Sequence, residues 1–176
     1  GKLGVLGAGS WGSALAGLCA IAGCEVVLRD IEPPGWPADA LAADSNKMVR
    51  AGLDAAKKSK PAAFFTAALA DKVTIGNFDD DLAHCKDADW IIEVVTENLE
   101  IKRALLKKVE QFRKPGSIVT TNTSGLPVAS IAEGQSEDLR QHWFGTHFFN
   151  PPSTRRMLEL NPTPDTTRDA NSEPGE

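Results

Sequence analysis

The sequence predicts an α/β fold built on a doubly wound, mostly parallel sheet with an inserted pair of helices. Two observations lead to this prediction. Short runs of apolar and β-branched residues alternate with helical repeats along the chain, as in parallel sheets joined by crossover helices. The first 30 residues also follow the order strand, glycine-rich loop, helix, strand. A chain of 176 residues is the usual size of one domain with a full core.

The opening βαβ unit is the most clearly defined part of the chain. A short apolar strand covers residues 3–6, and a helix with apolar residues at helical spacing follows it. That helix ends at Gly23, a suitable C-cap. Residues 25–30 form the second strand. Two strands joined by a helix in this way are parallel, with a right-handed crossover.

The middle of the chain has few apolar residues and many alanines and lysines. The stretch Glu-Pro-Pro-Gly-Trp-Pro over residues 32–37 interrupts regular structure. Residues 38–70 are expected to form the inserted helices, with an interruption near Pro61. A short strand over residues 73–75 and a small helix capped within 79–81 bring the chain back to the sheet.

The second half of the chain supplies the clearest helix and the remaining strands. Residues 98–113 place Leu and Val on one face and Lys and Glu on the other, a pattern typical of an amphipathic helix. A Pro-Gly pair ends this helix. The predicted strands of this half cover residues 90–95, 117–121, 143–149 and 157–160.

Composition and charge restrict the class of protein. The net charge of −5 argues against a general nucleic-acid binder, and no apolar run approaches the ~20 residues of a membrane span. Three cysteines without Cys-x-x-Cys spacing and no secretory leader favour a reducing, cytoplasmic location, and no residues have metal-ligand spacing. The folded domain is predicted to cover residues 1–160. Residues 161–176 are almost free of apolar side chains and are expected to form a disordered polar tail.

The loop after the first strand matches a dinucleotide-binding motif. Gly7 permits a tight turn, Gly9 lets backbone amides approach a pyrophosphate, and Gly12 lets the helix pack closely on the strand. Asp30 ends the second strand, where its carboxylate can bind ribose hydroxyls and would repel a 2′-phosphate, which favours NAD over NADP. Arg29 keeps NADP open, because an arginine at this place can accommodate a phosphate.

Polar residues gather where three predicted strands end, at the edge where open parallel sheets bind ligands. These residues are Glu97, Asn122, Ser124, His147 and Asn150. Glu159 lies 12 residues after His147, at the end of a further short strand, and a carboxylate that orients an imidazole is a common general-base pair. Ser124 could donate a hydrogen bond to a substrate oxygen. It lacks a Gly-x-Ser-x-Gly elbow and is not interpreted as a nucleophile.

Four segments together resemble the L-3-hydroxyacyl-CoA dehydrogenase family. They are the glycine loop, WIIEVVTENLEIK over residues 90–102, TNTSGL over 121–126 and GTHFFNP over 145–151, in the family's order. The resemblance covers roughly residues 2–160. It implies an N-terminal, Rossmann-type NAD-binding domain. The family's C-terminal helical domain, which carries most of its homodimer contacts, has no counterpart in residues 161–176.

The resemblance also implies a reaction and a role for each site residue. The reaction is oxidation of an L-3-hydroxyacyl-CoA to a 3-ketoacyl-CoA by NAD, as in fatty-acid β-oxidation. His147 would be the catalytic base, Glu159 its partner, and Ser124 the hydrogen-bond donor to the substrate oxygen. The implied cofactor contacts are Asp30 at the adenosine ribose and Glu97, Lys102, Asn122 and Asn150 around the nicotinamide and its ribose.

Two other functions stay open on the sequence. Without a helical domain, the chain could bind NAD with little or no turnover. A related NAD-dependent dehydrogenase of a free hydroxy acid or sugar acid is the other possibility, and activity on an acyl-CoA but not on the matching free acid would exclude it. Lys57, Lys58 and Lys60 are candidate CoA phosphate contacts or a solvated helix end.

Overall fold

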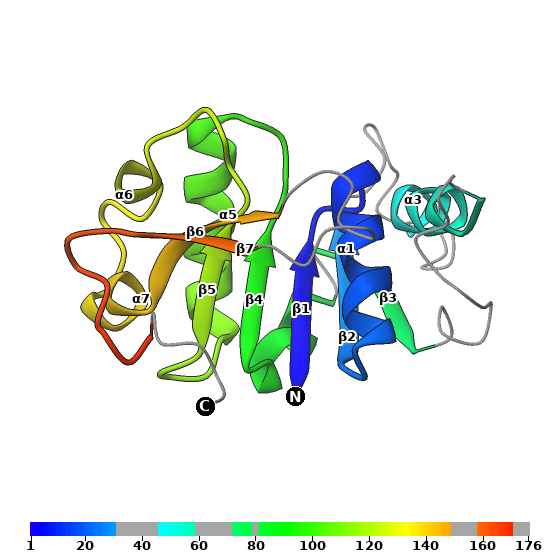
Figure 1. The fold of residues 1–176 in the computed structure, drawn as a ribbon, viewed down its shortest axis with the longest axis horizontal. Coiled ribbons are helices and arrows are strands. Elements are labelled where there is room, and N and C mark those ends of the chain that lie inside the picture. Colours follow the sequence, from blue (N-terminus) through cyan, green and yellow to red (C-terminus); the bar gives the residue numbers. More distant parts are fainter. Residues whose placement is uncertain (31–45, 59–71, 79–80, 149–157, 171–176) are drawn as a thin grey trace.

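One sheet of seven strands organises the part of the chain that the structure describes (Figure 1). This computed structural model describes residues 1–30, 46–58, 72–78, 81–148 and 158–170. The strands are β1 (Lys2–Leu6), β2 (Glu25–Asp30), β3 (Val73–Asn77), β4 (Trp90–Glu93), β5 (Ile118–Thr121), β6 (Trp143–Phe148) and β7 (Leu158–Pro162). Their order is β3-β2-β1-β4-β5-β6-β7, with β7 antiparallel to β6 and the other pairs parallel.

The strand order confirms the predicted doubly wound sheet. The chain starts at β1, builds outward through β2 and β3, and then returns to the other side of β1 with β4. Val5 of β1 lies between Leu28 of β2 and Ile92 of β4. Because the connections after β1 and β4 lead to opposite faces of the sheet, a crevice forms at the carboxyl ends of these two strands.

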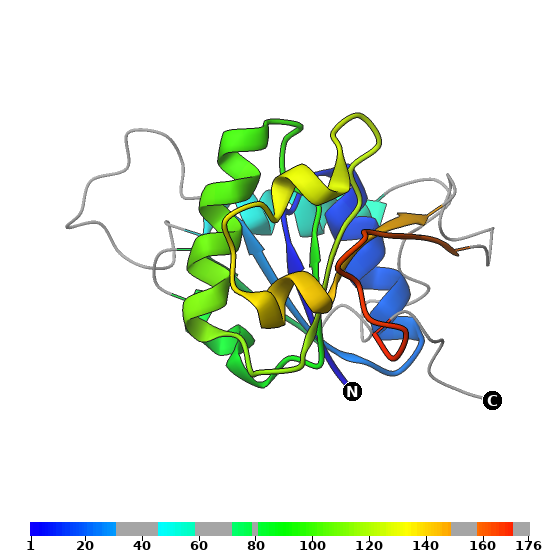
Figure 2. The ribbon, with the colours of Figure 1, turned by 90° about the vertical axis from the view of Figure 1, so that its left-hand side faces the viewer.

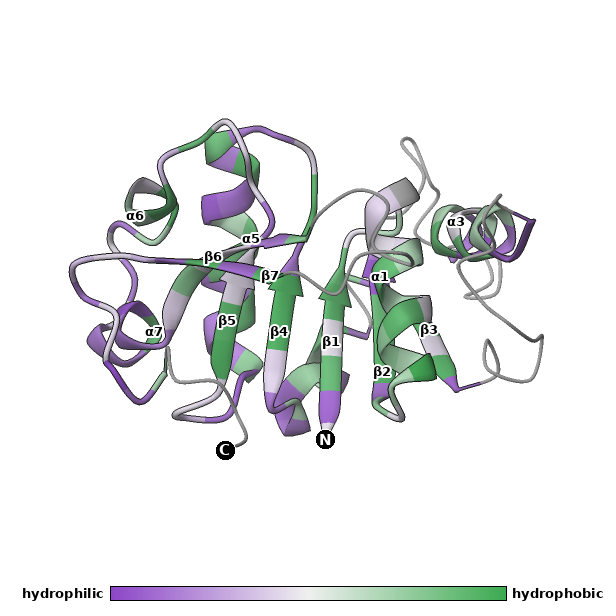
Figure 3. Cartoon of the chain, in the orientation of Figure 1, coloured by the Kyte–Doolittle hydropathy of each residue, from purple (hydrophilic) through white to green (hydrophobic). Residues whose placement is uncertain are grey.

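Helices cover both faces of the sheet (Figure 2). The helices α1 (Ser10–Ile21) and α3 (Lys47–Lys58) pack with Val5 and Leu28 on one face. The helix α5 (Leu99–Phe112) packs with Ile91 and Val119 on the other, together with the 3-10 helix η1 (Leu82–Asp87), α6 (Val128–Ile131) and α7 (Glu137–Gln141). Since both faces of the sheet are covered, the central strands are largely apolar, and the green segments of β1 and β4 in Figure 3 show this.

Local signals explain where the two main helices begin. The side chain of Asn98 accepts a hydrogen bond from Ile101 N at 3.1 Å and so caps α5. The helix α1 starts directly after Gly9 and lies very close to the preceding turn. A Cβ atom at Gly12 would be 1.7 Å from Gly7 O, so only glycine permits this approach, as predicted.

Some predicted elements differ from the structure or fall outside the described residues. Of the inserted pair, α3 is described, whereas residues 31–45 and 59–71, including the predicted interruption near Pro61, lie outside the described ranges. The strand predicted over 90–95 ends at Glu93. None of the helices in the described ranges is long and apolar enough to cross a membrane.

The folded part continues past the predicted boundary at residue 160. Strand β7 reaches Pro162, and Thr166 Oγ1 then donates a hydrogen bond of 2.6 Å to Trp143 O. Thr167 N also donates to Gln141 O at 2.9 Å, and Ala170 is buried. A strand is added to a sheet edge by main-chain hydrogen bonds, which do not depend on apolar side chains. The boundary predicted from the low hydropathy of this segment was therefore too early. Residues 171–176 lie outside the described ranges.

Candidate active site

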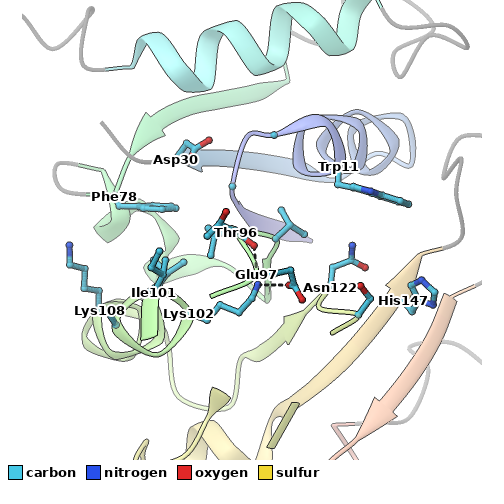
Figure 4. Close-up of a pocket in the computed structure, with 17 residues that line it drawn as sticks. Trp11, Asp30, Phe78, Thr96, Glu97, Ile101, Lys102, Lys108, Asn122 and His147 are labelled. Atoms are coloured by element: carbon cyan, nitrogen blue, oxygen red, sulfur yellow. Dashed lines mark hydrogen bonds and ion pairs between the residues drawn. The ribbon is translucent and has the colours of Figure 1, made fainter. Parts of the chain in front are cut away.

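A pocket of about 820 Å³ lies at the carboxyl ends of the central strands (Figure 4). Its walls come from the glycine loop, the end of β2, the loop after β4, helix α5 and the loop after β5. It brings together these predicted site residues: Gly7, Gly9, Asp30, Glu97, Lys102, Asn122, Ser124 and His147. Asp30 and His147 lie at opposite ends of it (Figure 4).

The glycine loop forms the Asp30 end of the pocket. Gly7 turns the chain with a φ of +116°, where a Cβ atom would lie 2.9 Å from Val94 O. The position beside Gly9 is open, with no atom within 4 Å of an added Cβ. Ala8 N donates to Asp30 Oδ2 at 2.8 Å, which ties the loop to the end of β2. An open glycine cradle at a helix N-terminus beside a carboxylate fits the pyrophosphate and ribose of a dinucleotide.

Arg29 does not contribute to this end of the pocket. Side chains alternate along β2, so the side chain of Arg29 points to the face of the sheet opposite that of Asp30. There it is fully buried. Its guanidinium donates to Thr74 O at 2.7 Å and to Asp81 O at 3.2 Å. Burial lowers the pKa of Arg29, and these carbonyl contacts hold the group inside the fold. The arginine is therefore engaged in the core instead of facing a 2′-phosphate, which supports NAD.

A buried ion pair underlies the middle of the pocket. Lys102 Nζ of α5 lies 2.6 Å from Glu93 Oε1 of β4, and both side chains are at most 1% exposed. The same ammonium donates to Val95 O at 3.0 Å and lies 3.2 Å from Glu97 Oε1. Lys102 lines the pocket, and its ammonium contacts two carboxylates, of which Figure 4 shows Glu97.

Glu93 was not predicted as part of the site. Its carboxylate accepts hydrogen bonds from Val95 N at 2.7 Å and from Thr121 Oγ1 at 2.6 Å, besides the contact with Lys102. Burial raises the pKa of Glu93, and these three donors oppose the rise. The sequence did hold a signal, since an acid inside the apolar run WIIEVV needs a buried partner.

Glu97 links the loop after β4 to the loop after β5. Its Oε2 accepts from Thr123 Oγ1 at 2.7 Å and from Gly125 N at 3.2 Å, so it holds the backbone on both sides of Ser124. Partial burial raises the pKa of Glu97, but the hydrogen bonds from Thr123 and Lys102 outweigh this effect and leave the pKa below its usual value. Glu97 is therefore a fixed carboxylate within the pocket.

The structure brings His147 and Glu159 together. They are directly opposite each other in the antiparallel pair β6 and β7, with His147 Nδ1 3.6 Å from Glu159 Oε2. Both side chains are about half exposed, at 45% and 54%. Phe148 N donates to Asn122 Oδ1 at 3.4 Å and so joins this strand to the loop that carries Ser124.

The remaining candidates do not all reach the pocket. Asn150 and Lys60 lie outside the described residues, and Lys57 pairs with Asp54 at 3.7 Å on α3. Trp11, which the sequence analysis did not assign, lines the pocket above Asn122 and His147 in Figure 4. In the described ranges, no group of His, Cys, Asp and Glu side chains could hold a metal ion.

The sheet order, the glycine loop at the reversal point and the pocket beside it define a Rossmann-type dinucleotide-binding domain. More specifically, the chain belongs to the family described as 3-hydroxyacyl-CoA dehydrogenase, NAD binding domain, which matches residues 2–173. This match confirms the resemblance seen in the sequence motifs.

Individual relatives agree with the family match. A "Probable 3-hydroxyacyl-CoA dehydrogenase" of Bacillus subtilis is 42% identical over 176 residues, which are 96% of this chain and 22% of that protein. One of the same name from Deinococcus radiodurans is 41% identical over 162 residues, 92% of this chain and 45% of that protein. The crystal structure of (S)-3-hydroxybutyryl-CoA dehydrogenase from Ralstonia eutropha superposes with a TM-score of 0.70 at 26% identity, over 96% of this chain and 56% of that one. The chain thus spans only part of the length of these relatives.

Proposed function

We propose that this chain is the cofactor-binding and proton-transferring part of an NAD-dependent dehydrogenase that oxidises L-3-hydroxyacyl-CoA to 3-ketoacyl-CoA in fatty-acid β-oxidation. One observation carries the proposal. A single pocket has a dinucleotide cradle with Asp30 at one end and His147 at the other (Figure 4), and Glu159 lies 3.6 Å from His147. Family membership supports the same reaction.

The cofactor contacts follow from the lining of the pocket. The glycine loop would hold the pyrophosphate, and Asp30 would accept hydrogen bonds from the adenosine ribose. The nicotinamide end would be surrounded by Glu97, Lys102 and Asn122. The sequence motif alone adds Asn150 to this group. When bound, NAD supplies the acceptor for the hydride that leaves C3 of the substrate.

The chain's own residues then handle the proton. The Nε2 atom of His147 takes the proton from the C3 hydroxyl as the carbonyl bond forms, while Nδ1 faces Glu159. The carboxylate of Glu159 lies 3.6 Å from Nδ1 and is opposite in charge to the imidazolium that results. Ser124 lines the same pocket and would donate a hydrogen bond to the substrate oxygen.

The substrate class is tested by running the reaction in reverse. We expect the 176-residue chain to oxidise NADH with acetoacetyl-CoA and not with acetoacetate, its free acid. Equal rates with the free acid would favour a hydroxy-acid dehydrogenase. Binding of NADH without turnover of either compound would favour a cofactor-binding module. The homodimer formed through a helical domain, the cytoplasmic location and the absence of nucleic-acid partners stay predictions.

A further inference from the structure

We infer that Glu93 and Glu97 give the part of the pocket proposed to hold the nicotinamide a net negative charge, which favours the oxidised cofactor relative to the reduced one. The inference rests on the proposed function, because both NAD+ and NADH must bind in this pocket. The two forms have nearly the same shape, and the nicotinamide ring of NAD+ carries one more positive charge. A fixed charge near that ring therefore acts on the difference between their affinities.

Among the described residues, the charges around the proposed nicotinamide position do not cancel. Two carboxylates, Glu93 and Glu97, face the single ammonium of Lys102 at 2.6 and 3.2 Å, which leaves one negative charge in excess. Two other charged side chains that line the pocket, Asp30 and Lys108, are of opposite sign and lie on the side away from His147 (Figure 4). The excess therefore lies in the part of the pocket lined by Glu97, Lys102 and Asn122, where the nicotinamide is proposed to bind.

Burial raises the pKa of Glu93, but the groups around its carboxylate favour the ionised form. The three groups that contact its oxygens, the backbone N–H of Val95, the hydroxyl of Thr121 and the ammonium of Lys102, all donate. The hydroxyl of Thr121 also accepts from Thr123 N at 3.2 Å, which leaves its own proton available for Glu93. A protonated acid would lose one of these contacts, because its O–H needs an acceptor.

Burial strengthens the interaction of the Glu93 and Lys102 charges with a bound ligand. Glu93 and Lys102 are screened from water, and the interaction between charges is stronger at low effective dielectric than in solution. Glu97 is more exposed, but its contacts with Lys102, Thr123 and Gly125 hold it in place. A charge that is already held in place does not have to reorganise when a ligand binds. Its electrostatic interaction therefore contributes fully to the binding free energy of the ligand.

The test compares the affinities of NAD+ and NADH for the wild-type chain and for Glu93→Gln, by calorimetric titration. The ratio of the two dissociation constants, NAD+ over NADH, should rise three- to tenfold, on the order expected for one unit charge in a partly solvated pocket. Glu93→Asp is the matched control. It disturbs the same contacts but keeps the charge, so both affinities should fall together and the ratio should stay unchanged.

A double variant separates charge from structure. Glu93→Gln with Lys102→Met removes one charge of each sign and restores the net charge of the wild type, so the ratio should return to the wild-type value. Asp138→Asn breaks a pair with Arg113 (2.7 Å) that does not line the pocket, and should leave the ratio unchanged. Glu97→Gln, at a half-exposed side chain, should raise the ratio even if the Glu93 variants fail to fold.

The outcomes distinguish the inference from the proposed function. A wild-type ratio in both Glu93→Gln and Glu97→Gln, with both cofactors bound, would overturn the inference and leave the proposed function standing. Failure of the wild-type chain to bind either cofactor would overturn both. A raised ratio in the double variant would also count against the inference, since the net charge there is that of the wild type.

Discussion

Replacing Lys102 by methionine should destabilise the fold by about 3–5 kcal/mol, because it leaves the carboxylate of Glu93 buried without its counter-ion. The hydrogen bonds from Val95 and Thr121 remain but carry no compensating charge. This loss is a large share of the roughly 5–15 kcal/mol that stabilises a typical domain. At about 2–4 °C for each kcal/mol in a chain of this size, the melting temperature should fall by roughly 6–20 °C.

The loss should depend on pH in a defined direction. Burial raises the pKa of Glu93 and Lys102 lowers it, so removing Lys102 raises it further. An acid whose pKa is higher in the folded state than in the unfolded state binds more protons when the protein is folded. The stability of the protein therefore falls as the pH rises. The deficit of the variant should therefore be largest above the folded pKa of Glu93 and should shrink as the pH falls towards the unfolded value.

Urea unfolding of the wild type and Lys102→Met between pH 5 and pH 8 measures this deficit. The double variant Glu93→Gln with Lys102→Met should recover most of the lost stability, because neither charge of this buried pair remains. A deficit that is equal at every pH, or a double variant no more stable than Lys102→Met, would refute the reasoning.

Three further predictions concern the cradle and the boundary of the fold. Gly12→Ala should lower the free energy of unfolding by about 3 kcal/mol or more in urea titrations, since its Cβ atom would lie 1.7 Å from Gly7 O; retained stability would contradict the packing of α1. Asp30→Ala should weaken NADH binding by about tenfold in fluorescence titrations, and unchanged affinity would count against its role at the ribose. Thr166→Val should cost about 1 kcal/mol through the lost bond to Trp143 O; no change in urea unfolding would place this segment outside the cooperative fold.

The central strands and the glycine loop could be predicted because their signals are local. Apolar β-branched runs and the Gly-x-Gly-x-x-Gly spacing identify these elements without knowledge of what packs against them. The ion pair of Glu93 and Lys102 joins a strand to a helix, and its geometry depends on how closely α5 approaches the sheet. The sequence therefore identified Lys102 through family resemblance alone and missed Glu93.

The sequence also did not show in which direction a side chain at a strand end points. Arg29 and Asp30 are neighbours, and either could have faced the cofactor. Alternation along β2 places Asp30 at the pocket and buries Arg29 on the other face, where backbone carbonyls accept its hydrogen bonds. The end of the fold was misplaced for a similar reason, since β7 is held by main-chain pairing that hydropathy does not register.

The pairing of His147 with the cofactor cradle is tested most directly by the variant His147→Gln in two parallel assays. One assay measures NADH binding and the other measures NADH oxidation with acetoacetyl-CoA. We expect NADH to bind the variant and the wild type with similar affinity, while turnover falls by about 100-fold or more because the proton has no acceptor. Turnover near the wild-type rate in His147→Gln would contradict the assignment of His147 as the base.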